Sequence, residues 1–93
     1  MAYRLKTTHR FEKDVKRCIK RGLDMGKLQE AMTILKDFGK LPPKYRPHLL
    51  RGNRVGQWEC HIEPDWLLIW EQNDEELVLL MITQVLIPIY SNI

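Results

Sequence analysis

The stretch from residue 56 to residue 70, Gly-Gln-Trp-Glu-Cys-His-Ile-Glu-Pro-Asp-Trp-Leu-Leu-Ile-Trp, constrains the fold more than any other part of the sequence. In its first half apolar and polar residues alternate, which is the period-two pattern of a half-buried strand. Pro64-Asp65 then supplies turn chemistry. The second half is apolar on both faces, as expected for a strand in the middle of a covered sheet. We therefore predict two adjacent antiparallel strands, Trp58–Ile62 and Trp66–Trp70.

Two amphipathic helices are predicted ahead of these strands. Thr8 is a suitable N-cap for the first helix, Thr8–Arg21, and Gly22 is suited to end it. The second helix, Met25–Phe38, follows Asp24 as its cap and ends before Gly39. Because the link is short, the two helices should form an antiparallel hairpin. Each helix has one apolar stripe at helical spacing, formed by Phe11, Val15, Cys18 and Ile19 in the first and by Leu28, Ala31, Met32 and Leu35 in the second.

The remaining segments complete a single α+β domain over residues 1–93. A short strand is predicted at Ala2–Lys6, a loop over residues 40–56, a polar turn at 71–76 and a third apolar run at Leu77–Ile82. The predicted architecture is a helical hairpin packed on one face of a small, mainly antiparallel sheet. The side chains expected to be largely buried are Trp58, Cys60, Leu68 and Leu35.

Composition narrows the class of protein and its surroundings. The net charge is +3, and most of the 15 basic residues lie before residue 45. This asymmetry suits an anionic partner such as RNA or an acidic protein, the alternative being a solvated basic surface. Cys18 and Cys60 lack a metal-ligand spacing and lie in apolar stretches, so we expect buried free thiols in a reducing cytoplasm. No apolar run is long enough to span a membrane or to act as a secretion signal.

Three side chains suggest acid–base chemistry: His48, His61 and Asp65. Histidine gains and loses a proton near neutral pH, and a neighbouring carboxylate can orient its ring. His61 and Asp65 are four residues apart across the predicted turn, so contact between them is plausible. The alternative is that His61 is a structural residue of its strand.

Three blocks of the chain carry a further signal. They are Phe11-x-Lys13-Asp14-Val15-Lys16, then Tyr45-x-x-His48-x-Leu50-x-Gly52, and then Glu59-Cys60-His61-Ile62-Glu63-Pro64-Asp65-Trp66-Leu67-Leu68-Ile69. Over roughly residues 3 to 80 this order resembles the YafQ branch of the RelE/ParE toxin superfamily. The resemblance implies a RelE-like fold and a bacterial type II toxin that cuts mRNA in the ribosomal A site without a metal or other cofactor. It also implies a co-expressed DinJ-type antitoxin that neutralises the toxin.

The resemblance also assigns roles to residues. His48 and His61 match the active-site histidines of the family, Asp65 matches its carboxylate, and Trp66 matches the aromatic beside that carboxylate. The 2′-hydroxyl of the RNA attacks the adjacent phosphate, so the protein supplies acid–base groups and charge stabilisation. Further contacts with RNA phosphates are expected from charge alone, at Arg51, Arg54, Lys13 and Lys16.

Two departures from the family pattern bear on activity. The family has arginine where this chain has Trp58. The family also ends in a Gly-Ser-His-Ser-Asp-Leu-Phe-like tail with a further catalytic histidine, whereas residues 83–93 of this chain contain no histidine. Cleavage is therefore expected to be impaired. The alternatives are a binding module that keeps the antitoxin and ribosome surfaces without cleaving, and a ParE-like gyrase inhibitor, which the two histidines and Asp65 disfavour.

The atypical tail is explained by a shift of reading frame. Thr83 to Asn92 can be back-translated as ACA CAG GTT CTC ATT CCG ATT TAT TCT AAT. Read from the third base of the Thr83 codon, the same DNA encodes Thr-Gly-Ser-His-Ser-Asp-Leu-Phe followed by a stop codon, which is the family ending. We infer a frame slip near Thr83, either natural or selected during cloning because an intact toxin kills its host. A diverged natural tail is the alternative.

Overall fold

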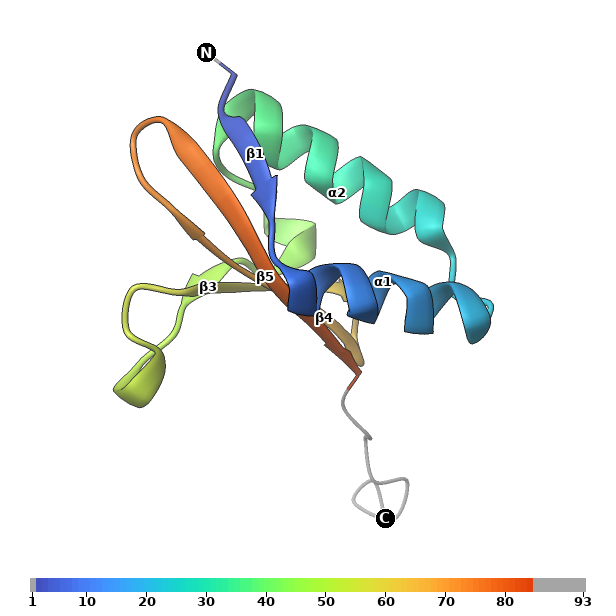
Figure 1. Ribbon diagram of the computed structural model, residues 1–93. Coiled ribbons are helices and arrows are strands. Elements are labelled where there is room, and N and C mark those ends of the chain that lie inside the picture. Colours follow the sequence, from blue (N-terminus) through green and yellow to red (C-terminus); the bar gives the residue numbers. More distant parts are fainter. Residues whose placement is uncertain (1, 85–93) are drawn as a thin grey trace.

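The structure, a computed structural model, describes residues 2–84 and consists of two helices on one side of a five-stranded sheet (Figure 1). In chain order the elements are β1 Arg4–Thr7, α1 His9–Lys20, α2 Met25–Phe38, β2 His48–Leu49, β3 Trp58–Glu63, β4 Trp66–Gln72 and β5 Glu76–Gln84, with short 3₁₀ helices at Pro43–Tyr45 and Gly52–Arg54. The strand order is β1-β5-β4-β3-β2; β1 is parallel to β5 and the other pairs are antiparallel. The α+β prediction is confirmed, and the inferred frame slip concerns a tail that lies almost wholly outside the described residues.

Both helices form where the caps predict them. The Thr8 side chain accepts a hydrogen bond from the backbone N–H of Phe11, and the Asp24 side chain accepts one from that of Gly26. Gly39 ends α2 with φ of 69°, a left-handed conformation that glycine adopts without strain. Figure 1 shows α2 returning in roughly the opposite direction to α1, as in the predicted hairpin.

One helical position was predicted wrongly. Ile19, assigned to the apolar stripe of α1, is 59% exposed, whereas Asp14 is 1% exposed on the buried face. The buried residues of α1 are Phe11, Asp14 and Cys18. A pattern based on hydrophobicity alone leaves charged residues out. It therefore assigned Ile19, and not Asp14, to the buried face of the helix.

The central hairpin follows the prediction closely. β3 and β4 are antiparallel, with Cys60 opposite Leu68. Cys60, Leu68 and Leu35 are fully buried. Trp58 was also expected to be largely buried but is only half-buried, because it lies at the rim beside the two-residue edge strand β2. Its ring stacks on that of Trp70, with 6.0 Å between the ring centroids.

The segment from residue 40 to residue 56 is more ordered than the predicted loop. It contains both 3₁₀ helices and the edge strand β2, in which His48 lies opposite Glu59 and Leu49 opposite Trp58. A strand of two residues is too short to show alternation in the sequence, so only pairing with β3 reveals it.

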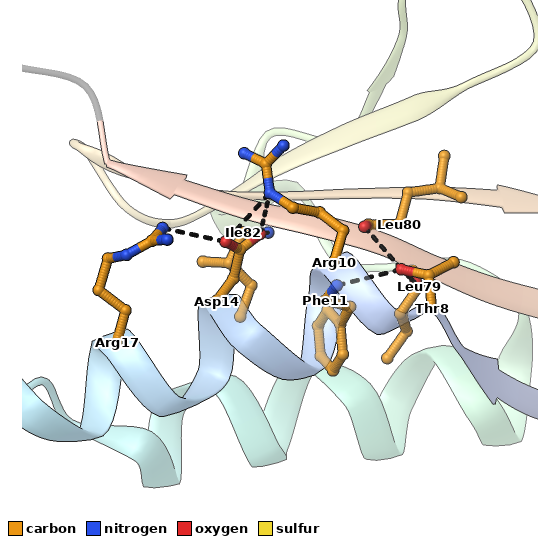
Figure 2. A network of polar contacts seen from close by, with 8 residues as sticks. All are labelled: Thr8, Arg10, Phe11, Asp14, Arg17, Leu79, Leu80 and Ile82. Atoms are coloured by element: carbon orange, nitrogen blue, oxygen red, sulfur yellow. Dashed lines mark hydrogen bonds and ion pairs between the residues drawn. The ribbon is translucent and has the colours of Figure 1, made fainter.

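Thr8, the N-cap of α1, and Asp14 within α1 supply hydrogen bonds to the C-terminal half of β5 (Figure 2). β1 pairs with β5 only as far as Leu79. Beyond it, the Thr8 hydroxyl lies 3.0 Å from the carbonyl oxygen of Leu79 and 2.8 Å from that of Leu80, and the Asp14 carboxylate accepts the backbone N–H of Ile82 at 3.0 Å. Buried backbone groups need such partners, so α1 is fixed to the sheet by hydrogen bonds as well as by packing.

None of the helices formed by residues 2–84 combines the length and the apolar character needed to cross a membrane.

Both cysteines should be unreactive in the folded protein. They are free and buried, and burial raises the pKa of the Cys60 thiol to about 12. Burial also raises the pKa of Cys18, against a smaller lowering by the neighbouring indole N–H of Trp66. Because the thiolate is the nucleophile, we expect negligible alkylation by iodoacetamide at mildly alkaline pH and full alkylation of both residues in denaturant. Mass spectrometry measures this, and rapid labelling of the folded protein would contradict it.

Candidate active site

The two faces of the sheet have different partners. On β3, Cys60 and Ile62 belong to the core that packs against the helices. Glu59 and His61 alternate with them, so their side chains lie on the opposite face. Among residues 2–84 no helix covers that face, which we call the open face (Figure 1). Polar groups on the open face are therefore available to a ligand.

His48 and His61 lie side by side on the open face. His48 in β2 is paired with Glu59, two residues before His61 on β3. The centroids of the two imidazole rings are 6.3 Å apart, and the ring planes are inclined by 34°. Because both residues belong to paired strands, backbone hydrogen bonds of the sheet fix this separation.

His48 has an oxygen acceptor at each ring nitrogen. Nδ1 lies 3.0 Å from the carbonyl oxygen of Arg46, and Nε2 lies 3.1 Å from Oε1 of Glu59. A carbonyl and a carboxylate can only accept hydrogen bonds, so the ring satisfies both partners when both of its nitrogens carry a proton. These two partners fix the orientation of the His48 ring.

His61 has a different set of partners. Its Nδ1 lies 3.2 Å from the carbonyl oxygen of Pro64. The ring donates this hydrogen bond when Nδ1 carries the proton, and this tautomer leaves Nε2 with a free lone pair. His61 also lines a hollow of about 450 Å³, to which Lys44 and Arg46 contribute positive charge. The lining also holds one carboxylate, that of Glu63, so two cations against one anion leave the hollow with a net charge of +1.

Tyr45 anchors the segment that carries His48. Its ring is 5% exposed, and its hydroxyl donates a hydrogen bond to Oε1 of Glu30 in α2 at 3.0 Å. Burial, and then Glu30, raise the pKa of Tyr45, so the phenol stays protonated and remains a donor. Lys44 donates to the same Glu30 oxygen at 3.0 Å, which lowers the pKa of Glu30. The Tyr-x-x-His spacing therefore joins a buried anchor to an exposed histidine.

Asp65 and Trp66 are placed differently from the two histidines. Asp65 is half-buried in the turn between β3 and β4, and the carbonyl oxygen of Pro64, not the Asp65 carboxylate, contacts Nδ1 of His61. Trp66 is 1% exposed and packs in the core on the helix side. A ring that stacks on a base must be accessible. We therefore do not retain the expected contact between Trp66 and RNA.

The expected phosphate contacts lie in two separate regions. Arg51 and Arg54 are exposed in the segment between β2 and β3, next to the histidines in sequence. Lys13 and Lys16 are exposed on α1, on the helix side of the sheet. An RNA segment that lies flat on the open face can reach the first pair and not the second.

Two further positions were not resolved by sequence reasoning. Glu59, which holds His48, was absent from the candidate residues, since its contact depends on the register between β2 and β3. Trp58 replaces the family arginine, but it lies on the same face as Cys60, facing away from the histidines. The substitution therefore removes no charge from the histidine side. No group of three potential ligands is arranged to hold a metal ion within residues 2–84.

Comparisons with known proteins agree in pointing to one family. A family model described as "Bacterial toxin of type II toxin-antitoxin system, YafQ" matches residues 3–84. The mRNA interferase toxin YafQ of Escherichia coli K12 is 43% identical over 68 residues, which cover 72% of this chain and 74% of the relative.

Solved structures share the fold. YafQ from E. coli BL21(DE3) superposes with a TM-score of 0.83 at 35% identity, covering 88% of this chain and 92% of that chain. The E. coli DinJ–YafQ toxin–antitoxin complex gives 0.83 at 34% identity, covering 90% and 93%. A metal-bound toxin from Helicobacter pylori gives 0.79 at 31% identity, covering 90% and 94%.

Proposed function

Since this chain belongs to the YafQ family of bacterial type II toxins, we propose that it is an mRNA interferase that cuts mRNA on the ribosome. A DinJ-type antitoxin is its proposed partner, because the E. coli relative forms a complex with DinJ. We further propose that cleavage by the chain as given is weak, since the tail histidine expected from the family is missing from its sequence.

The proposed reaction is an attack within the RNA. The Nε2 lone pair of His61 takes the proton of a 2′-hydroxyl, whose oxygen forms a bond to the adjacent phosphorus. The bond from phosphorus to the 5′-oxygen breaks, and the leaving oxygen takes a proton from the histidine of the family tail where that tail is present, or from water in the chain as given. The products are a 2′,3′-cyclic phosphate and a 5′-hydroxyl. When both nitrogens of His48 carry a proton, the charge of the ring stabilises the negative charge that accumulates on the phosphate. Glu59 is a positioning residue, because it acts through His48.

The observation that carries this proposal is the contrast between two neighbouring histidines. One ring has acceptors at both nitrogens, and the other has a partner only at Nδ1 among residues 2–84, with 6.3 Å between the ring centroids. At this separation the lone pair of His61 can reach the 2′-hydroxyl while His48, held by Arg46 and Glu59, acts on the adjacent phosphate through its charge. Asp65 remains a candidate for this site by resemblance alone, and its substitution belongs in the same series.

Substituting either histidine tests the proposal. In a chain carrying the family tail, His48→Gln and His61→Gln should each lower mRNA cleavage by about 10²–10⁴-fold, the contribution of one acid–base group. Cleavage of mRNA on programmed ribosomes, mapped by primer extension, measures the effect. His9→Gln is the matched control, because His9 is exposed at the start of α1 on the helix side.

The outcome also separates the two classes of function. Undiminished cleavage by His48→Gln and His61→Gln would contradict the catalytic assignment. Antitoxin and ribosome binding without any cleavage, even with the family tail in place, would favour the non-catalytic binding module.

A further inference from the structure

Two arginines of α1 and the arginine that caps its C-terminus line one hollow at the edge of the sheet. Arg10, Arg17 and Arg21 follow one another at helical spacing along a single flank of the helix. The hollow has a volume of about 240 Å³, and the end of β5 forms its other wall through Ile82, Thr83 and Gln84. It is separate from the hollow beside His61, and none of the roles assigned above uses it.

Among residues 2–84 Asp14 is the one carboxylate in the lining of this hollow, and its hydrogen-bonding capacity is full. It is 1% exposed. Its oxygens accept Nε of Arg10 at 3.1 Å, Nη1 of Arg17 at 3.0 Å and the backbone N–H of Ile82 at 3.0 Å. Three guanidinium groups against one carboxylate leave the lining with a net charge of +2.

The arginines keep donors for a ligand. Arg10 binds Asp14 through Nε alone, and Figure 2 shows its two terminal nitrogens directed away from the carboxylate. Arg17 uses one terminal nitrogen for Asp14, and Arg21 uses one for the side-chain oxygen of Gln84 at 2.6 Å. The buried carboxylate holds the heads of Arg10 and Arg17 in position, so their remaining N–H groups are ordered before a ligand arrives.

We propose that this arginine pocket binds a phosphate of the single-stranded RNA substrate. Tetrahedral phosphate accepts hydrogen bonds from several directions, which suits donors that converge from three side chains. Inorganic phosphate shares this chemistry. The inference rests on the proposed function and adds a substrate subsite to it.

The position of the pocket relative to His61 supports RNA over an acidic protein segment. His61 is opposite Leu67 on β4, and Leu67 is opposite Thr83, which lines the pocket. Two strand spacings place Thr83 about 10 Å from His61. In a stacked strand, phosphates advance about 3.4 Å along the axis, so the pocket lies roughly three or more nucleotides from the cleaved bond. Within residues 2–84 no strand pairs with β5 beyond Leu79 on this side, and Thr8 and Asp14 occupy the edge as far as Ile82. The RNA would therefore pass around the edge at Thr83 and Gln84, where the pocket lies.

The test is the salt dependence of RNA binding by the weakly cleaving chain as given. Fluorescence anisotropy with a labelled single-stranded oligoribonucleotide gives the slope of log K against log salt concentration. Each phosphate contact that is lost should reduce the magnitude of this slope by about 0.7. Arg21→Gln is the cleanest variant, because Arg21 contacts Gln84 and not the buried Asp14. Because the pocket takes one phosphate, the double variant Arg10→Gln, Arg17→Gln should also reduce the slope by no more than about 0.7.

Arg4→Gln is the control, with the same change of charge. Arg4 pairs with Glu75, just before the start of β5, whereas the pocket is at the end of β5. Arg4→Gln should therefore leave the salt dependence of RNA binding unchanged. Circular dichroism melting verifies that each variant is folded.

Unchanged slopes in the pocket variants would overturn the subsite, and the proposed function would stand if the histidine variants still abolish cleavage. If the pocket variants bind the antitoxin more weakly but bind RNA as before, the pocket is a site for an acidic protein. This result would also overturn the RNA subsite. If inorganic phosphate binds the pocket but the pocket variants keep the full salt dependence of RNA binding, the pocket is a site for free anions. That result would also overturn the RNA subsite.

Discussion

Replacing residues 83–93 with Thr-Gly-Ser-His-Ser-Asp-Leu-Phe should raise mRNA cleavage by about 10²–10⁴-fold. The leaving 5′-oxygen needs a proton, and a histidine is the residue that supplies one near neutral pH. In the chain as given the corresponding residues are Val85, Leu86 and Ile87, which have no proton to transfer. Under the proposed function, restoring the tail adds one acid–base group to the proposed pair, His48 and His61.

The sheet brings the start of such a tail to the correct place. Thr83 is in register with Leu67, and Leu67 with His61, so the tail leaves β5 about 10 Å from His61. An extended chain advances about 3.3–3.6 Å per residue, and the family histidine is three residues beyond Thr83. The restored histidine can therefore reach the pair formed by His48 and His61.

Growth arrest and mRNA cutting on induction measure the effect of the tail. The matched control is the same tail with glutamine in place of its histidine, which should leave cleavage at the level of the chain as given. Full toxicity from the sequence as given would contradict the prediction. The encoding DNA around codon 83 tests the frame slip directly, because the inferred slip requires the alternative frame to read through to the family stop codon.

Trp70→Ala should lower the free energy of unfolding by about 3–5 kcal/mol. Trp70 is 1% exposed in the central strand β4, stacks on Trp58, and donates its indole N–H to Oε1 of Gln72 at 2.7 Å. Gln72 in turn donates to the carbonyl oxygen of Gly39 at 2.9 Å, which ties the sheet to the end of α2. The substitution leaves a large cavity and removes the partner that fixes Gln72.

Urea denaturation followed by circular dichroism measures this loss. A domain of this kind is stable by about 5–15 kcal/mol, so the variant should be partly unfolded or close to it. Val55→Ala is the control, because Val55 is 75% exposed and its truncation should change stability by less than about 0.5 kcal/mol. A loss below about 1 kcal/mol for Trp70→Ala would show that the core collapses around the cavity.

Local patterns in the sequence determined the helices, the central hairpin and the family. Helix caps, apolar spacing and the Pro64-Asp65 turn each depend on residues within a few positions of one another, so they are visible without a structure. The candidate histidines could be found in the same way, because the blocks that resemble the family are contiguous.

Contacts between distant residues were decided only by the tertiary structure. Glu59 holds His48 because β2 and β3 pair in one register, and a shift of one residue would put the carboxylate on the other face. Asp14 is buried because it binds the backbone of Ile82, 68 residues later. Trp66 matches the family pattern, yet packing against the helices buries it, and the pattern cannot show which face of β4 the helices cover. Burial of a polar group and assembly of a site depend on which strands become neighbours, and no local window of sequence contains that information.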